Sequence, residues 1–224
     1  MSLYVSFDGG SGVGKGALIE WCREYFSAQG KRVAVLKDNR LDPLRDTGAL
    51  MLPWCAKNHV DQSDFLFPLF AAGYAHSDMQ LNEALCHHDI VLRDRCFISS
   101  LAYVAASGRF DPEQIWSLYV ESLRIRVPNV AVLVDADLDI ATSRIERRKQ
   151  KDIGLGGKMS GDRDRREAVR EHFLALPARF GDRVNMIAVS NNGAHTDDSK
   201  ALRTSLDMVG EKIVEFCRQK EEVS

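Results

Sequence analysis

Residues 9–16, with the sequence Gly-Gly-Ser-Gly-Val-Gly-Lys-Gly, have the types and spacing that bind phosphate in proteins. They match the pattern G-x-x-x-x-G-K-[ST] except at its last position, where Gly16 replaces a hydroxyl residue. Glycines allow positive φ angles that turn successive backbone N–H groups toward one phosphate, and Lys15 adds a full charge. We therefore predict that the phosphates of a nucleotide are bound by Gly9, Gly10, Ser11, Gly12, Val13, Gly14, Lys15, Gly16 and Ala17.

The segments on either side of this loop have the order that such a site requires. Leu3 to Phe7 is an apolar, strand-forming run, and apolar residues recur after the loop at helical spacing. The helix would direct its positive N-terminal end at the same phosphate. The alternative is a glycine-rich turn that only joins a buried strand to a helix, and the combination of strand, lysine and helix argues against it.

Composition and charge narrow the class of protein. The 224 residues are 45% hydrophobic and 28% charged, which is typical of one globular domain spanning residues 1–224. The net charge of −2 gives no general attraction to nucleic acid or to an anionic membrane, so neither is expected as a partner. No apolar run approaches the roughly 20 residues of a membrane span and no secretory signal is recognised, which predicts a cytoplasmic protein. The five cysteines include no C-x-x-C pair, so neither a disulfide framework nor a zinc site is expected.

Five apolar runs alternate with segments of helical periodicity along the chain. This alternation predicts an α/β fold, a three-layer sandwich around a five-stranded parallel sheet. Strands are expected at Leu3–Phe7, Arg32–Leu36, Ile90–Leu92, Val130–Val134 and Val184–Val189. Helices are expected between them, including 44–51, 63–85, 99–106, one starting at the Asp111 cap and a closing helix over 202–216. Pro68 either kinks the long helix or marks its start.

A basic segment before the last strand resembles a mobile lid. The helix that follows Leu138 carries many cations, and Gly154 to Gly157 then gives a flexible stretch. We expect the lid to span about 146–163. A run of charges is, however, just as often an ordinary solvated helix face, and that alternative stays open here.

Charged residues follow several of the predicted strands at their carboxyl ends. Because these ends meet at one edge of a parallel sheet, Arg40, Asp94, Arg95 and Asp135 are expected near the glycine loop. Phosphoryl transfer requires mainly positioning and positive charge, which Lys15 and Arg95 can supply. Asp94 or Asp135 could hold the water ligands of a magnesium ion. A salt bridge between Asp94 and Arg95 that only caps a strand is the structural alternative.

Two further segments resemble the thymidylate kinase family. Residues 90–96, Ile-Val-Leu-Arg-Asp-Arg-Cys, followed by Ser-Ser-Leu-Ala-Tyr at 99–103, are similar to that family's Asp-Arg-Tyr segment and its downstream run. Leu-Phe-Ala-Ala at 69–72 resembles its L-F-A-A segment. The resemblance covers most of the chain, to Phe180, and implies a P-loop nucleotide kinase fold, ATP and Mg²⁺ as cofactors, and phosphorylation of a nucleotide such as dTMP.

The resemblance also implies roles for individual residues. Phe70 would stack on the acceptor base, although a core position is as common for a phenylalanine. Arg95 would bind the acceptor phosphate, and the wider acceptor site would comprise Arg40, Phe70, Tyr74, Arg95, Ser99, Ser100 and Tyr103. Family members without an arginine in the glycine loop place the catalytic arginine in the lid, and the candidates here are Arg144, Arg147, Arg148 and Arg163. The family also suggests a homodimer.

The chain departs from the family pattern at several positions. An acid is usual at Ser11, Ser or Thr at Gly16, Thr at Ala17, and a base-reading arginine at Tyr74. Gly16 need not abolish catalysis, because adenylate kinases are similar there with G-K-G-T. Two alternatives therefore remain beside a thymidylate kinase: a kinase of another nucleotide, nucleoside or small hydroxyl compound, and a nucleotide-binding switch or regulatory protein that has lost transfer.

Overall fold

A computed structural model describes residues 2–37, 51, 53–55, 57–60, 62–149, 163–192, 207 and 209–215, with the backbone alone at 62–66, 148 and 149. Several features expected from the sequence lie outside these residues: Arg40, most of the helix at 44–51, most of the lid at 146–163, the side chain of Arg148 and part of the closing helix at 202–216.

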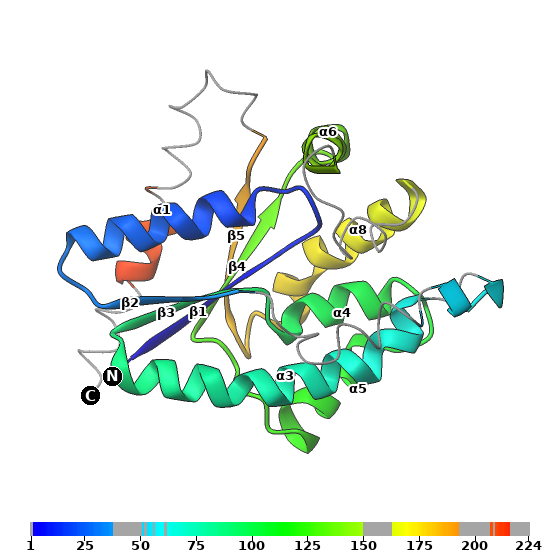
Figure 1. The fold of residues 1–224 in the computed structure, drawn as a ribbon, viewed down its shortest axis with the longest axis horizontal. Helices are drawn as coiled ribbons and strands as arrows, with labels where there is room; N and C mark the ends of the chain where they lie inside the picture. Colours follow the sequence, from blue (N-terminus) through cyan, green and yellow to red (C-terminus); the bar gives the residue numbers. More distant parts are fainter. Residues whose placement is uncertain are drawn as a thin grey trace.

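The centre of the protein is the predicted sheet of five parallel strands (Figure 1). Its order is β2-β3-β1-β4-β5, so β1 is central and pairs with β3 on one side and β4 on the other. The strands are β1 (Leu3–Asp8), β2 (Val33–Leu36), β3 (Ile90–Asp94), β4 (Val130–Asp135) and β5 (Asn185–Ser190). The parallel α/β prediction is confirmed.

Helices cover both faces of the sheet, as Figure 1 shows. They are α1 (Lys15–Ala28), α3 (Gln62–His87), α4 (Phe97–Ala105), α5 (Pro112–Trp116), α6 (Leu138–Lys149) and α8 (Arg163–Phe180). A π-helical segment, Ser117–Ser122, follows α5, and residues 209–215 are also helical. Within the described residues, no helix has both the length and the apolar character needed to cross a membrane.

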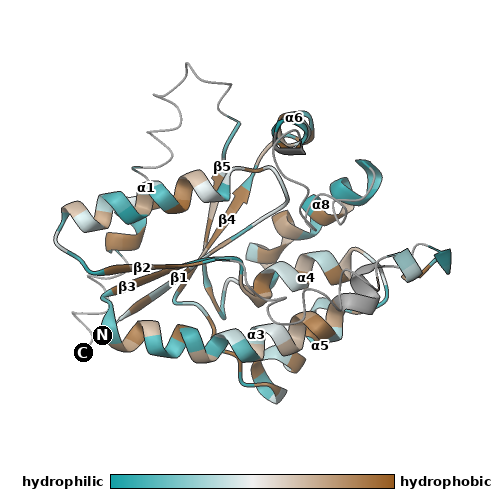
Figure 2. Ribbon diagram, viewed as in Figure 1, coloured by the Kyte–Doolittle hydropathy of each residue, from teal (hydrophilic) through white to brown (hydrophobic). Residues whose placement is uncertain are grey.

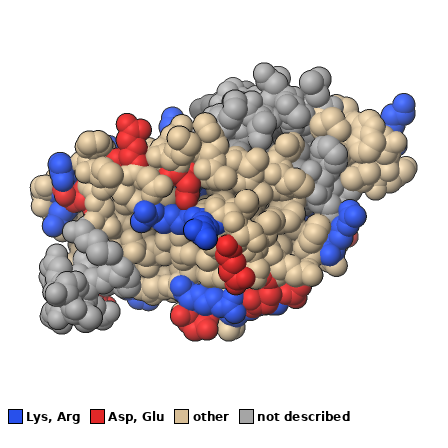
Figure 3. All heavy atoms as spheres, turned by 90° about the horizontal axis from the view of Figure 1, so that it is seen from below, with Lys and Arg blue, Asp and Glu red and all other residues tan. Residues whose placement is uncertain are grey.

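The alternation of side chains along the strands creates two cores. Val5, Phe7 and Leu92 pack on the α1 side, whereas Tyr4 and Val91 pack on the side of α3, α4 and α8. Hydrophobic residues accordingly concentrate on the strands, and the helices mix both kinds (Figure 2). On the face drawn in Figure 3, basic and acidic side chains are interspersed, as the small net charge would suggest.

The structure settles the role of Pro68, which the sequence left open, and shifts two predicted boundaries. Helix α3 continues through Pro68, so this proline does not mark its start. Helix α4 begins at Phe97, two residues before the predicted start, because the Cys96 sulfur accepts the backbone N–H of Ile98. Asp111 caps α5 as predicted, in a reciprocal capping box with Gln114. Strand β3 extends to Asp94, so this acid belongs to the strand end itself.

Phe180 joins the end of α8 to the core. Its ring is fully buried and stacks on Trp116, with centroids 5.2 Å apart. Replacing Phe180 with alanine should lower the free energy of unfolding by about 3–5 kcal/mol, because it removes buried area and leaves a cavity. Leu174→Ala, on the same helix but 55% exposed, is the matched control and should change it by about 0.5 kcal/mol or less. Urea unfolding measures both, and equal losses would contradict the packing assigned to Phe180.

Candidate active site

The glycine loop joins β1 to α1 at the carboxyl edge of the sheet, and three of its glycines are required by its shape. Gly9, Gly12 and Gly14 have φ angles of 148°, 83° and 93°. A Cβ atom on Gly12 would lie 2.3 Å from the Ala141 carbonyl oxygen, and one on Gly9 would lie 2.2 Å from that of Val134. The loop therefore packs against β4 and α6 at distances that only glycine allows.

Gly16 differs from these three glycines. It lies in the first turn of α1, and a Cβ atom there would meet nothing within 4 Å. Packing therefore does not require glycine at this position, and the absence of a hydroxyl side chain there is not imposed by a lack of space.

Two side chains from distant elements hold the loop from outside. The Asn191 amide nitrogen, just after β5, donates to the Val13 carbonyl oxygen at 2.8 Å. Arg144 of α6 donates through Nη1 to the Asn191 carbonyl oxygen at 3.2 Å and to that of Val13 at 3.4 Å. Of the four lid candidates, Arg144 is thus placed against the phosphate loop.

Lys15 and Arg95 share one anchor in the loop. Lys15 Nζ donates to the carbonyl oxygens of Gly9 at 3.2 Å and Gly10 at 2.8 Å. Arg95 Nη1 donates to the same Gly9 oxygen at 2.7 Å, and its guanidinium lies 5.5 Å from the centroid of the Tyr103 ring. The structure thus brings together Lys15, Arg95 and Tyr103 with the loop glycines, all of which the sequence assigned to the site.

Arg95 is directed at the loop by a buried acid, Asp8, at the end of β1. Asp8 accepts hydrogen bonds from the Cys96 backbone N–H at 3.0 Å and from the Ser99 hydroxyl at 2.6 Å. Burial, and then the charge of Asp8, raise the pKa of the Cys96 thiol, which stays protonated and donates to Asp8 at 3.4 Å. These bonds flank Arg95, whose φ of 66° lies in the left-handed region.

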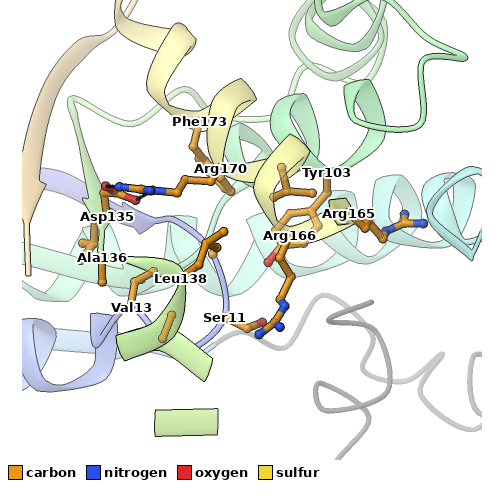
Figure 4. Close-up of a pocket in the computed structure, with 14 residues that line it drawn as sticks. Ser11, Val13, Tyr103, Asp135, Ala136, Leu138, Arg165, Arg166, Arg170 and Phe173 are labelled. Carbon is orange, nitrogen blue, oxygen red and sulfur yellow. Dashed lines mark hydrogen bonds and ion pairs between the residues drawn. The ribbon is translucent and has the colours of Figure 1, made fainter. Parts of the chain in front are cut away.

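A pocket opens between the loop, the end of β4 and helix α8 (Figure 4). Gly10, Ser11 and Val13 line one side of it, and Arg165, Arg166 and Arg170 line the α8 side. Tyr103 of α4 and Phe173 of α8, whose rings meet edge to face at 5.8 Å, also line it. A pocket lined by a phosphate loop and arginines is suited to phosphate groups.

The two candidate metal residues are in different situations. Asp135 accepts from Arg170 through both oxygens, at 2.8 and 2.7 Å, so its charge is already paired. Asp94 has one buried oxygen, Oδ1, that accepts no hydrogen bond within the described part of the chain. No cluster of three or more His, Cys, Asp or Glu side chains occurs among the described residues, so a metal here would depend on water or phosphate ligands.

Several other residues that the sequence assigned to the site are not among those that line the pocket. Phe70 and Tyr74 are 3% and 1% exposed, and Tyr74 packs edge to face on Tyr119 at 5.7 Å. Ser100, also buried, accepts a hydrogen bond from the Tyr119 hydroxyl at 3.1 Å. Arg163 forms an exposed ion pair with Asp139 at 2.7 Å, and Arg147 is exposed; neither is among the residues that line the pocket.

Comparison with known proteins agrees with this geometry. The family model described as thymidylate kinase matches residues 7–198. The chain belongs to the thymidylate kinase family. It is similar to the thymidylate kinase of Bifidobacterium longum strain DJO10A, with 31% identity over 195 residues, covering 85% of this chain and 91% of that protein. It is also similar to the thymidylate kinase of Acinetobacter baumannii strain SDF, with 30% identity over 181 residues, covering 80% of this chain and 89% of that protein.

Within this thymidylate kinase family fold, three sets of side chains at the site were not predicted from the sequence. The position of Asp8 could have been recognised from the sequence. It ends a buried strand directly before the loop, and a buried carboxylate requires hydrogen-bond donors. Asn191 follows the last strand in a polar stretch, and the sequence does not show what its side chain contacts. Arg165, Arg166 and Arg170 lie in a mixed-charge stretch, and the sequence does not show which of its charges face the pocket.

The two kinds of glycine predict opposite effects of alanine. Gly12→Ala should destabilise the protein by more than about 1 kcal/mol and weaken ATP binding, because the new methyl group meets the Ala141 carbonyl at a positive φ. Gly16→Ala should instead raise the free energy of unfolding by about 0.5–1 kcal/mol, through helix propensity. Thermal unfolding and ATP titration test both, and similar results for the two variants would refute this distinction.

Because Asp8 accepts buried hydrogen bonds, removing its side chain should lower the free energy of unfolding more than removing an exposed acid does. Asp8→Ala should lower the free energy of unfolding by about 1–3 kcal/mol, because it leaves the buried Cys96 N–H without an acceptor. Asp8→Asn keeps an acceptor oxygen and should lose less. Asp139→Ala, whose side chain is 81% exposed, is the control and should lose about 0.5 kcal/mol or less. If Asp8→Ala behaves like this control in urea unfolding, the network is not stabilising.

Proposed function

We propose that this chain phosphorylates thymidylate, converting dTMP and ATP to dTDP and ADP. Family membership and the names of its relatives support this reaction. The observation that carries it is the shared anchor at Gly9, which holds the lysine of the donor loop and Arg95 on one carbonyl oxygen. Donor and acceptor phosphates bound by these two cations would be neighbours, which in-line transfer requires.

In this reaction an oxygen of the acceptor phosphate forms a bond to the γ-phosphorus of ATP, and the bond from that phosphorus to the β–γ bridging oxygen breaks. ADP leaves with the electron pair. The backbone N–H groups of the loop and the N-terminal end of α1 bind the donor phosphates. Lys15 Nζ, which lies at the Gly9 and Gly10 carbonyl oxygens, would donate to phosphate oxygens of the donor, and Arg95 would hold the acceptor phosphate.

Magnesium fits this site through Asp94 better than through Asp135. The buried Asp94 Oδ1 has its acceptor capacity unused within the described residues, whereas Asp135 is occupied by Arg170. Bound magnesium would neutralise charge on the nucleotide phosphates. Since neither Gly16 nor Ala17 supplies a hydroxyl, Asp94 would act through metal-bound water.

The choice of acceptor base depends on the residue at position 74. Tyr74, where the family pattern implies a base-reading arginine, is 1% exposed and offers no forked donor. A kinase of another nucleotide therefore remains the second candidate, and a nucleotide-binding switch that has lost transfer is the third.

Purified protein with ATP, magnesium and a panel of nucleoside monophosphates separates these three candidates. Diphosphate formed fastest from dTMP supports thymidylate kinase; ATP binding that requires Lys15 without turnover of any acceptor supports a switch. The homodimer and the cytoplasmic location stay predictions.

The role of Arg95 is tested by Arg95→Ala. This variant should reduce kcat/KM for the acceptor by roughly tenfold to a hundredfold or more, since a charge-assisted hydrogen bond contributes about 1.5–3 kcal/mol, while ATP affinity stays within about twofold. Arg32→Ala is the control: Arg32 is an exposed cation paired with Asp89 before β2, and its loss should leave both quantities unchanged. Steady-state kinetics and ATP titration measure them, and an equal loss for ATP and acceptor would remove Arg95 from the acceptor site.

A further inference from the structure

Helix α8 contributes three arginines to the pocket, on the side opposite the phosphate loop. None of them follows from the glycine motif or from the lid candidates. Figure 4 shows that the three differ in direction: Arg170 turns toward Asp135, Arg165 extends away from the pocket centre, and Arg166 points to the side where Ser11 lies. Their different surroundings indicate different roles.

Arg170 is held by acids. Its guanidinium forms two hydrogen bonds with Asp135 and lies 3.5 Å from Asp137, so it joins α8 to the end of β4. The hydrogen bonds to Asp135 raise the pKa of Arg170, which keeps the guanidinium charged. Arg170 therefore neutralises the carboxylate that lines the pocket, and the pocket retains a positive balance.

Arg166 is held in place by a neutral group. Its Nη1 donates to the Thr142 hydroxyl oxygen at 2.7 Å, and that hydroxyl itself donates to the Leu138 carbonyl oxygen at 2.6 Å. This anchor on α6 fixes the direction of the guanidinium without compensating its charge. Among the described residues, no carboxylate forms an ion pair with Arg166.

Arg166 also has an unused donor. Its Nε is buried and donates to no acceptor in the described part of the chain. A buried N–H without an acceptor is unfavourable, because the donor has lost its hydrogen bond to water without gaining another. Such a group is expected where a ligand supplies the missing acceptor.

The pocket around Arg166 favours an anionic ligand with several oxygens. Gly10 and Ser11 lie across from it, and Val134, Val169 and Phe173 make much of the lining apolar. The apolar lining lowers the local dielectric constant and strengthens the attraction between a guanidinium and an anion. A guanidinium presents parallel N–H donors that match two oxygens of one phosphoryl group.

We propose that Arg166 is a phosphate-contacting residue of this site, fixed by Thr142 and directed at a phosphoryl group opposite Gly10 and Ser11. The inference rests on the proposed kinase reaction and extends it, because it places the second arginine of the transfer site on α8. The phosphoryl group is either that of the acceptor nucleotide or the one in transfer, and the experiment distinguishes them.

The test compares Arg166→Gln with Arg179→Gln. Arg179 lies on the same helix, pairs with Asp111 and Glu113 outside the pocket, and its replacement removes the same charge. Calorimetric titrations with dTMP, thymidine and ATP, together with kcat, are measured for the wild type and both variants. Arg166→Gln should weaken dTMP binding about tenfold or more without affecting thymidine, or else lower kcat about tenfold or more with all affinities unchanged. The first result assigns Arg166 to the acceptor phosphate and the second to the transferred group.

The anchor is tested separately through Thr142. Thr142→Val keeps the charge of Arg166 but removes its acceptor and should produce part of the same loss, whereas Thr142→Ser keeps the hydroxyl and should resemble the wild type. The proposal is overturned if Arg166→Gln matches Arg179→Gln in every quantity, or if dTMP and thymidine affinities fall equally along with the melting temperature, which indicates a structural role.

A failure of the proposed thymidylate kinase reaction can be distinguished from a failure of the role proposed for Arg166. If the wild type does not bind dTMP, the thymidylate assignment fails, and the site of Arg166 is then tested with pyrophosphate. A loss of pyrophosphate affinity of about tenfold in Arg166→Gln but not in Arg179→Gln supports the phosphate contact. Equal affinity of the two variants for pyrophosphate overturns it.

Discussion

The carbonyl oxygen of Gly9 is the point on which the geometry of the site depends. It accepts hydrogen bonds from Lys15 on α1 and from Arg95 after β3, two cations that belong to different elements of the fold. The oxygen can do so because Gly9 has a φ of 148° and packs directly on β4. One backbone conformation therefore sets the separation of the charges that receive the two phosphates.

The loop has this conformation because the elements around it hold it there. Asp8, at the end of the central strand, binds the start of α4 and so places Arg95. Asn191 and Arg144 bind the Val13 carbonyl oxygen from the end of β5 and from α6. The site is thus formed by strand ends that are adjacent in the sheet order β3-β1-β4-β5, although they are far apart in the chain.

The electrostatics of the pocket follow from how its charges are paired. Arg170 neutralises the charge of Asp135, so Asp135 reduces the positive potential of the pocket only slightly. Arg166 is bound by a hydroxyl and keeps its charge and one unused donor. Asp94 is the carboxylate at the sheet edge with an unused buried oxygen among the described residues. A protein that binds a nucleotide with magnesium needs this distribution of positive and negative groups.

Much of the fold and of the donor site was determined by the sequence itself. The glycine loop and the five apolar runs are local patterns, and the rule that parallel strands end at one edge placed Arg95 beside the loop. The sequence could not show which charges face the pocket, because the direction of a side chain on a mixed-charge helix depends on what the helix packs against. Only the tertiary structure therefore decided that Asp8 organises the site, that Asp135 is paired, and that Arg166 of α8 faces the phosphate loop.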